Sequence, residues 1–281
     1  PPPIQGLNPG EYYDTNALLH ITNTTHSSKA WATQVTFWNW NEQRNVTVEN
    51  INVRAMIAAG DWPSNGLIYC NTPVRLSNAD TLATKLMLAS CRTIYTMGDF
   101  NTKAKKGASL MTMHRIYHLS GTWSDANSTN SKNRNAANTT INAALVDGAP
   151  TVDEYNWVDR NDDHRYDANN GIIYDNWDQK TAATFHNPVN SSDPWANCDD
   201  LLEKWSGFTL TKLGSTVHLS GGVMAANLDN SGITEDQIPW VRKLGYAAPT
   251  RVYMYDPDLS TAAGQPPFTP LIGHIKSWEP Y

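Results

Sequence analysis

Short apolar runs separated by polar turns fill the chain between residues 66 and 119. The runs are only three or four residues long, and many carry β-branched or aromatic side chains, as in 67–70, 74–76, 86–88, 93–95, 110–113 and 116–119. Turn-forming stretches such as Gly98-Asp99-Phe100-Asn101 separate them. Runs of this kind are typical of strands. The pattern predicts a mainly β fold, with the Asp and Asn side chains of the turns at its corners and an Asn ladder between them.

Equivalent residues in these runs recur at a nearly constant spacing. Cys70 and Cys91 are 21 residues apart, and Tyr95 and Tyr117 are 22 apart. A repeat of this length with two or three short strands per period predicts a parallel β-solenoid (β-helix), in which equivalent residues of successive coils stack about 4.8 Å apart. A β-sandwich of short antiparallel strands, with turns every ~8 to 12 residues, is the alternative.

The first 60 residues predict a different organisation from the coils. Residues 33–40 alternate in polarity and 45–48 form a second run, so the two predict a hairpin through residues 41–44. Residues 50–59 predict a short helix that begins at Asn50 and ends at Gly60. We therefore expect an extended arm, a hairpin and a short helix in 1–60, with no end cap, and a solenoid-like domain in 61–281.

The strand pattern stops at Asp147 and returns only near Thr209. We expect residues 65–148 and 201–222 to form one β core, with 150–200 as an irregular insertion. After residue 233 the chain predicts a turn, a brief helix and an extended tail. The tail carries prolines that cannot donate to a sheet ladder: Pro249, Pro257, Pro266, Pro267, Pro270 and Pro280.

Composition and charge favour a secreted protein. Charged residues make up 17% of the chain, and Asn, Ser and Thr supply much of its polarity. The net charge of −6 and the lack of a Lys/Arg cluster argue against nucleic acid, and no apolar run reaches the ~20 residues of a membrane span. The start at Pro1 without Met suggests a mature product, extracellular or on the cell surface. Five sequons are possible glycosylation sites: Asn23, Asn45, Asn127, Asn138 and Asn190.

The cysteines predict a disulfide rather than a metal site. Cys70, Cys91 and Cys198 have neither CxxC spacing nor paired histidines nearby. If Cys70 and Cys91 stack on adjacent coils, their Cα atoms lie within reach of a disulfide. We therefore expect these two residues to be bonded and Cys198 to stay outside the pair.

The acidic residues do not predict an enzyme. The loop 159–170 is rich in Asp and Asn and is a weak candidate for Ca²⁺, but it lacks the frame of an EF-hand, so a solvated loop is favoured. Asp199-Asp200 and Glu235-Asp236 fit the first turns of helices better than an acid and base pair. We expect no catalytic constellation and no cofactor.

Several longer phrases carry a family resemblance. They lie at 73–78, 93–102, 119–128, 138–145, 203–211, 249–251 and 255–258. Over about residues 65–275 the chain resembles a family of uncharacterised bacterial surface proteins encoded with type IV pilin-like genes. The resemblance implies a secreted, solenoid-like surface protein and brings no known activity. Residues 1–60 depart from the family pattern because they lack a long apolar pilin helix, and an insertion lies between Pro150 and Trp195.

Two functions follow as hypotheses. The first is a structural subunit of an extracellular filament, sheath or pilus-like appendage that assembles from identical copies. Terminal and aromatic residues would make the contacts between copies: Pro1, Pro2, Pro3, Ile4, Trp38, Trp40, Phe268, Leu271, Ile275, Trp278 and Tyr281. The second is a carbohydrate-binding or carbohydrate-active solenoid whose partner is a surface polysaccharide. A Trp-lined groove with convergent carboxylates would favour the second, and aromatics buried between subunits the first.

Overall fold

The chain is described here by a computed structural model. It describes residues 6–39, 44–114, 116–129, 135–148, 157–159, 171–173, 209–213, 216–220, 223–225, 250–254, 256–261 and 264–269. From residue 157 to residue 254 the description is of strand backbones and their pairing.

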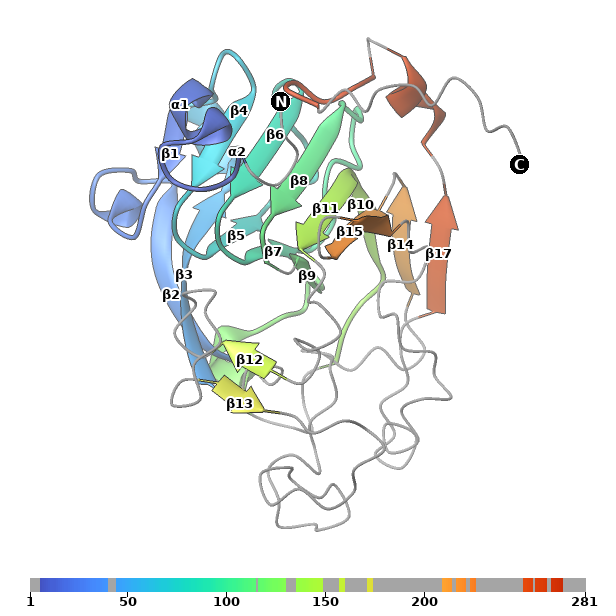
Figure 1. The fold of residues 1–281 in the computed structure, drawn as a ribbon. Helices are drawn as coiled ribbons and strands as arrows, with labels where there is room; N and C mark the ends of the chain where they lie inside the picture. The colour runs from blue at the N-terminus through green and yellow to red at the C-terminus, as the bar shows by residue number, and fades with distance from the viewer. Residues whose placement is uncertain are drawn as a thin grey trace.

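The strands form three sheets and a separate strand pair (Figure 1). Sheet A has the order β1 (Leu19–Ile21), β4 (Leu67–Cys70), β6 (Leu86–Ser90), β8 (Ala108–Thr112), β11 (Ala144–Gly148), β15 (Thr216–Ser220) and β16 (Val223–Ala225). Sheet B has the order β2 (Ala32–Asn39), β3 (Arg44–Asn52), β5 (Val74–Ser77), β7 (Ile94–Met97) and β9 (Ile116–Leu119). Sheet C has the order β10 (Thr139–Asn142), β14 (Thr209–Leu213) and β17 (Thr250–Met254), and β12 (Trp157–Asp159) pairs with β13 (Gly171–Ile173).

The chain coils through these sheets in turn. It passes from a strand of sheet A to one of sheet B, crosses a third side, and returns to sheet A beside the strand it left, in parallel register. On the third side Asn101 N donates to Ala79 O at 2.7 Å, and Phe100 N donates to Thr140 O at 2.9 Å, so this side leads into sheet C. The predicted parallel β-solenoid is confirmed, and the sandwich alternative is wrong.

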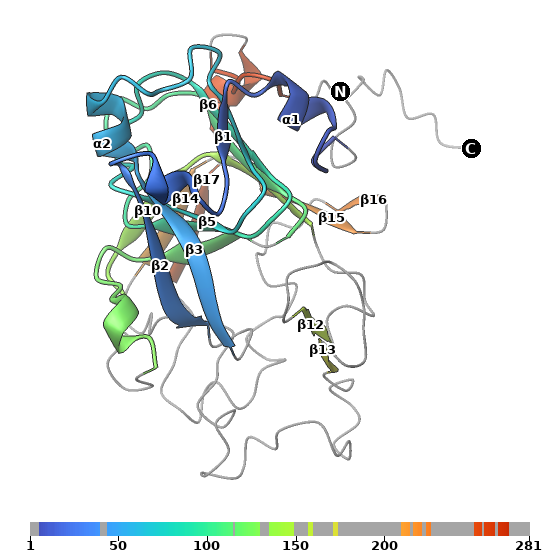
Figure 2. The ribbon, with the colours of Figure 1, turned by 90° about the vertical axis from the view of Figure 1, so that its left-hand side faces the viewer.

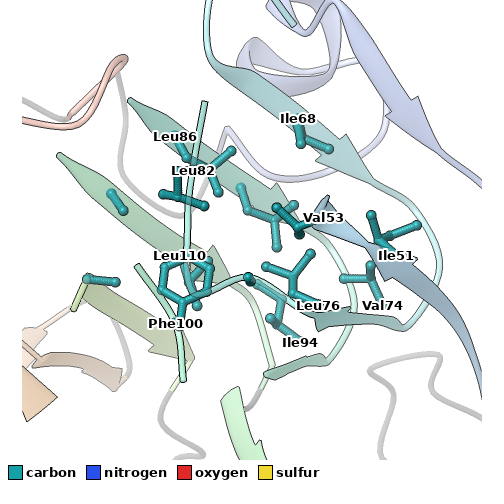
Figure 3. Packing of buried hydrophobic residues seen from close by; sticks show 14 of the residues in the cluster. Ile51, Val53, Ile68, Val74, Leu76, Leu82, Leu86, Ile94, Phe100 and Leu110 are labelled. Carbon is teal, nitrogen blue, oxygen red and sulfur yellow. The ribbon is translucent and has the colours of Figure 1, made fainter. Parts of the chain in front are cut away.

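Stacked aliphatic columns fill the interior (Figure 3). In sheet A, Leu88 pairs with Ile68 on one side and with Leu110 on the other, and all three are at most 2% exposed. Val74 and Ile94 form a facing column in sheet B. Because side chains alternate along a strand, one residue in two reaches this core. A stack of such columns buries apolar area in every coil, which stabilises the repeat.

The corners between sheet B and the third side follow the predicted turn chemistry. Gly98 and Asn101 have positive φ angles of 76° and 56°, a conformation that Gly and Asn adopt most easily. The buried Asn101 donates its Nδ2 to Asn142 O at 2.9 Å, and Asn142 Nδ2 donates to Asn101 O at 3.1 Å. The expected Asn ladder therefore links successive coils at this corner.

Residues before position 60 share the same core. The helix α2 (Val53–Ala58) buries Val53 and Met56 in the interior cluster, and the side chain of Asn52 caps it by accepting from Ala55 N at 3.1 Å. The helix begins later than predicted because β3 continues to Asn52. The helix α2 therefore covers the third side of the first coil, while β2 forms an edge of sheet B, and the predicted division at residue 60 lies within one core.

The register of sheet A places the two cysteines differently from the prediction. Cys70 pairs with Ser90, 20 residues later, so Cys91 lies one position beyond its expected partner. A shift of one residue moves a side chain to the opposite face of the sheet. Cys70 accordingly packs in the interior and Cys91 in the cluster on the outer face, and both are free thiols. The predicted Cys70–Cys91 disulfide is not formed, and Cys198 lies outside the described residues.

Pairing of the later strands joins distant parts of the chain. β15 extends sheet A beside β11, and β14 pairs with β10. The expected continuity between the core before residue 148 and the strands after residue 209 is therefore present in the backbone pairing. Apart from β12 and β13, the predicted insertion 150–200 lies outside the described residues. The strand β17, which pairs with β14, replaces part of the expected extended tail.

Candidate assembly surfaces

The outer face of sheet A is apolar and is covered by the N-terminal segment. Leu7, Tyr13 and Ala17 pack on side chains of the strands below them, including Tyr69 and Met87. The Tyr69 hydroxyl donates to Leu7 O at 2.8 Å. Tyr13 belongs to the helix α1 (Tyr12–Asn16), which lies beside β1 (Figure 2). From residue 6 onward, the predicted extended arm therefore covers its own solenoid.

The C-terminal segment docks nearby. Lys105 Nζ lies 2.7 Å from Asp256 Oδ1 and 2.7 Å from Asp258 Oδ2, at the start of the 3-10 helix η7 (Pro257–Ser260). A Cβ at Gly107 would collide with the carbonyl oxygen of Gly264, so only glycine permits this approach. Phe268 then packs edge-on against Tyr12, with ring centroids 6.3 Å apart.

Two of the predicted assembly residues, Phe268 and Trp38, lie among the described residues. Phe268 packs within its own chain, because the apolar face of sheet A requires cover from water. Trp38 is half-buried beside the aromatic cluster of sheet B, and its N–H donates to Ser128 Oγ at 2.9 Å. The remaining predicted contacts lie outside the described residues: Pro1, Pro2, Pro3, Ile4, Trp40, Leu271, Ile275, Trp278 and Tyr281.

An aromatic cluster covers the outer face of sheet B. Phe37 packs edge-on against Tyr95 at 5.3 Å and Trp123 at 5.5 Å between ring centroids, and Tyr117 stacks on Tyr95 at 5.2 Å. Tyr95 and Tyr117 are register partners, as their 22-residue spacing predicted. Phe37, Tyr95 and Trp123 are buried, so these rings stabilise the fold and do not present an open platform for stacking on sugars.

A buried arginine fixes the loop over this cluster. Arg75 donates to both carboxylate oxygens of Asp125, at 2.6 and 3.0 Å, and its Nε donates to Asn50 Oδ1 at 2.8 Å. Trp123 Nε1 donates to the same carboxylate at 2.8 Å. The side chain of Arg75 is 4% exposed and lies over the ring of Phe37. A carboxylate that accepts charge-assisted hydrogen bonds on both oxygens stabilises the position of the loop that carries it.

Other described acids are likewise engaged in pairs. The buried Glu49 accepts from His26 N at 3.0 Å. Hydrogen bonds from Trp31 and Lys29 hold the pKa of Asp61 below its usual value. In the described part of the chain no three His, Cys, Asp or Glu side chains converge on one point. The candidate Ca²⁺ loop lies almost wholly outside that part.

One edge of sheet B is formed by the eight-residue strand β2, and the other by β9. Asn52 N donates to Trp31 O just before the strand, so the backbone groups of Thr33, Val35 and Phe37 point toward β3. Those of Gln34 and Thr36 point away from the sheet. Both residues are exposed, and no described residue pairs with their backbone. The outward backbone N–H and C=O groups of Gln34 and Thr36 form the β2 edge, which is a row of donors and acceptors without a partner among the described residues.

Four of the predicted sequons lie among the described residues. Asn23, Asn45, Asn127 and Asn138 are all exposed, a geometry that glycosylation requires. Asn190 lies outside the described residues. Glycosylation stays a prediction.

Comparisons with known proteins identify no relative. No family model, no curated protein and no solved structure matches this chain. Among the described helices none has the length and apolar character needed to cross a membrane.

Proposed function

We propose that this protein is a structural subunit of an extracellular filament, sheath or pilus-like appendage, built from identical copies. The observation that carries the proposal is the stacking of coils, in which sheet B ends in the long strand β2; β2 pairs with β3 on one side, and no described strand pairs with its other side. An unprotected strand edge is a template for another chain. Copies added along the stacking direction would continue the architecture that each copy already has.

The use of charge and aromatic residues supports a scaffolding role. Arg75 and Asp125 fasten a loop to sheet B, and Lys105 fastens the C-terminal segment to the coil. The large rings of sheet B pack on one another instead of lining a binding surface. Each of these groups stabilises the subunit itself. The resemblance to bacterial surface proteins and the four exposed sequons fit a secreted location.

Negative-stain imaging and light scattering of the purified native protein test the proposal. We expect filaments or sheets with a regular subunit repeat that grow with protein concentration. The matched control is Leu110→Asp, which places a charge in the interior column and should abolish both fold and assembly. A native protein that stays monodisperse at high concentration would contradict the proposal, and so would fibres that persist in the control.

A further inference from the structure

The three sides of the solenoid end differently where the chain enters the coil. Sheet A begins with β1, which has only three residues and carries His20, whose Nε2 lies 2.9 Å from Asp14 Oδ1. The third side begins with the helix α2, whose Arg54 lies 3.3 Å from the carboxylate of Asp80. Short strands, charged side chains and covering helices are the devices by which proteins block sheet edges. Only sheet B begins with a long strand.

From Ala32 to Phe37, β2 carries none of these blocking devices, whereas at Trp38 the loop that holds Ser128 already lies on its edge. Its sequence from Ala32 to Asn39 contains no charged residue and no proline. The side chains of Thr33, Gln34 and Thr36 are exposed, and Val35 is half-buried. The backbone N–H of Trp38 also points away from β3 and donates to Ser128 Oγ at 2.9 Å, so an outward N–H of this strand pairs when an acceptor is within reach. The outward groups of Gln34 and Thr36 have no such partner among the described residues.

We propose that the β2 edge pairs with the β2 edge of a second copy of this chain, antiparallel and about a twofold axis at Val35. The inference rests on the proposed function, because it names one contact of the assembly. The outward N–H and C=O of Gln34 face those of Thr36 in the second copy, and the reverse pair follows by symmetry. The pairing joins the two five-stranded B sheets into one.

The side chains of β2 are compatible with antiparallel pairing between two identical strands. An antiparallel contact between identical strands places equal charges close together, so a charged edge repels itself, and this edge is neutral. Gln34 and Thr36 side chains can bond across the pair, and the two Val35 side chains meet at the axis. Polar amide and hydroxyl pairs and a β-branched contact are favourable cross-strand neighbours.

Sedimentation velocity on charge variants tests the contact. In Gln34→Lys/Thr36→Lys each lysine faces a lysine of the second copy, and we expect self-association to weaken at least tenfold with an unchanged circular dichroism spectrum. The matched control, Thr81→Lys/Ala83→Lys, adds the same charge to exposed positions of the loop between β5 and β6 and should associate like the native protein.

A disulfide trap tests the axis without depending on a charge. In a Cys198→Ser background, Val35→Cys should form covalent dimers on mild oxidation, because residues at the axis form a non-hydrogen-bonded pair with Cα atoms about 4.5 Å apart. Thr33→Cys, two residues from the axis, should cross-link far more slowly. Equal cross-linking of the two variants would overturn the inference.

The outcomes separate the inference from the proposed function. Filaments that persist in the double lysine variant would overturn the β2 contact and leave the filament proposal standing. A native protein that stops at dimers, which the variant dissociates, would support the contact and defeat the filament. A native protein that is monomeric at all concentrations overturns both.

Discussion

The outer faces of sheets A and B are both covered, but by segments of different origin. Sheet A is covered by residues from both ends of the chain, through apolar contacts such as Leu7 and Phe268. Sheet B is covered by its own hairpin and by the loop after β9, fastened by Arg75 and Asp125. The comparison shows that the described residues near both ends of the chain cover their own subunit, and that the hairpin of sheet B presents an edge that no described strand pairs with.

The largest effect should come from removing the cover of sheet A. Deleting residues 1–17 exposes Tyr69, Met87 and their buried neighbours, and we expect a loss of roughly 5 kcal/mol in the free energy of unfolding or outright insolubility. Urea unfolding measures it. Deletion of residues 1–5 is the matched control, because it keeps every described residue of the cover. A deletion of 1–17 that unfolds like the native chain would show that the cover is dispensable.

The second prediction compares two arginine–aspartate pairs. Arg75→Ala removes a buried partner that holds the cover of sheet B, and we expect a loss of about 3 kcal/mol. Arg54→Ala removes an exposed partner, since its side chain is 66% exposed, and should cost about 0.5 kcal/mol or less. Equal losses in chemical unfolding of the two variants would mean that Arg75 does not fasten the loop.

The third prediction uses two tyrosines under the cover of sheet A. Tyr69→Phe removes the donor to Leu7 O and should cost about 1 kcal/mol. Tyr13 is equally buried, but its hydroxyl has no partner among the described residues, so Tyr13→Phe should be neutral or slightly stabilising. Thermal unfolding of both variants measures the difference, and a reversed order would contradict the packing described for the N-terminal segment.

The smallest effect is a dependence on alkaline pH. Burial, with Tyr12 nearby, raises the pKa of Tyr13 from 10.0 to about 12. Below pH 10 both states hold the proton. Between pH 10 and about 12 the unfolded chain releases it first, so this group's contribution to stability is lost as the pH rises. Tyr13→Phe should therefore lose less stability than the native protein between pH 9 and 11. Identical losses would place Tyr13 in water.

The coils were predictable because their signal is local and periodic. The 22-residue spacing of Tyr95 and Tyr117 corresponds to a true register pair, and the hairpin of β2 and β3 follows from alternation within each strand. The disulfide prediction failed on a detail that spacing does not resolve. One coil has 20 residues where the cysteines are 21 apart, and that single residue reverses the face on which Cys91 lies.

The covers were harder to predict because their contacts are distant in sequence. Nothing local pairs Leu7 with Tyr69 or Phe268 with Tyr12. Tyr13 and Ala17 have the i, i+4 spacing of a helix face, but a helix of five residues gives too short a periodic signal beside a Pro-rich segment. The β2 edge was likewise not predictable from the sequence, since only the sheet order shows that none of the described strands pairs with the outer side of β2.

Amide hydrogen exchange along β2 tests the central claim most directly. Val35 and Phe37 donate toward β3, so their amides should be protected in dilute and concentrated protein alike. The amides of Gln34 and Thr36 should exchange quickly in dilute protein and become protected as subunits associate. If these two amides exchange equally fast in the associated protein, the β2 edge is not where copies of this chain meet.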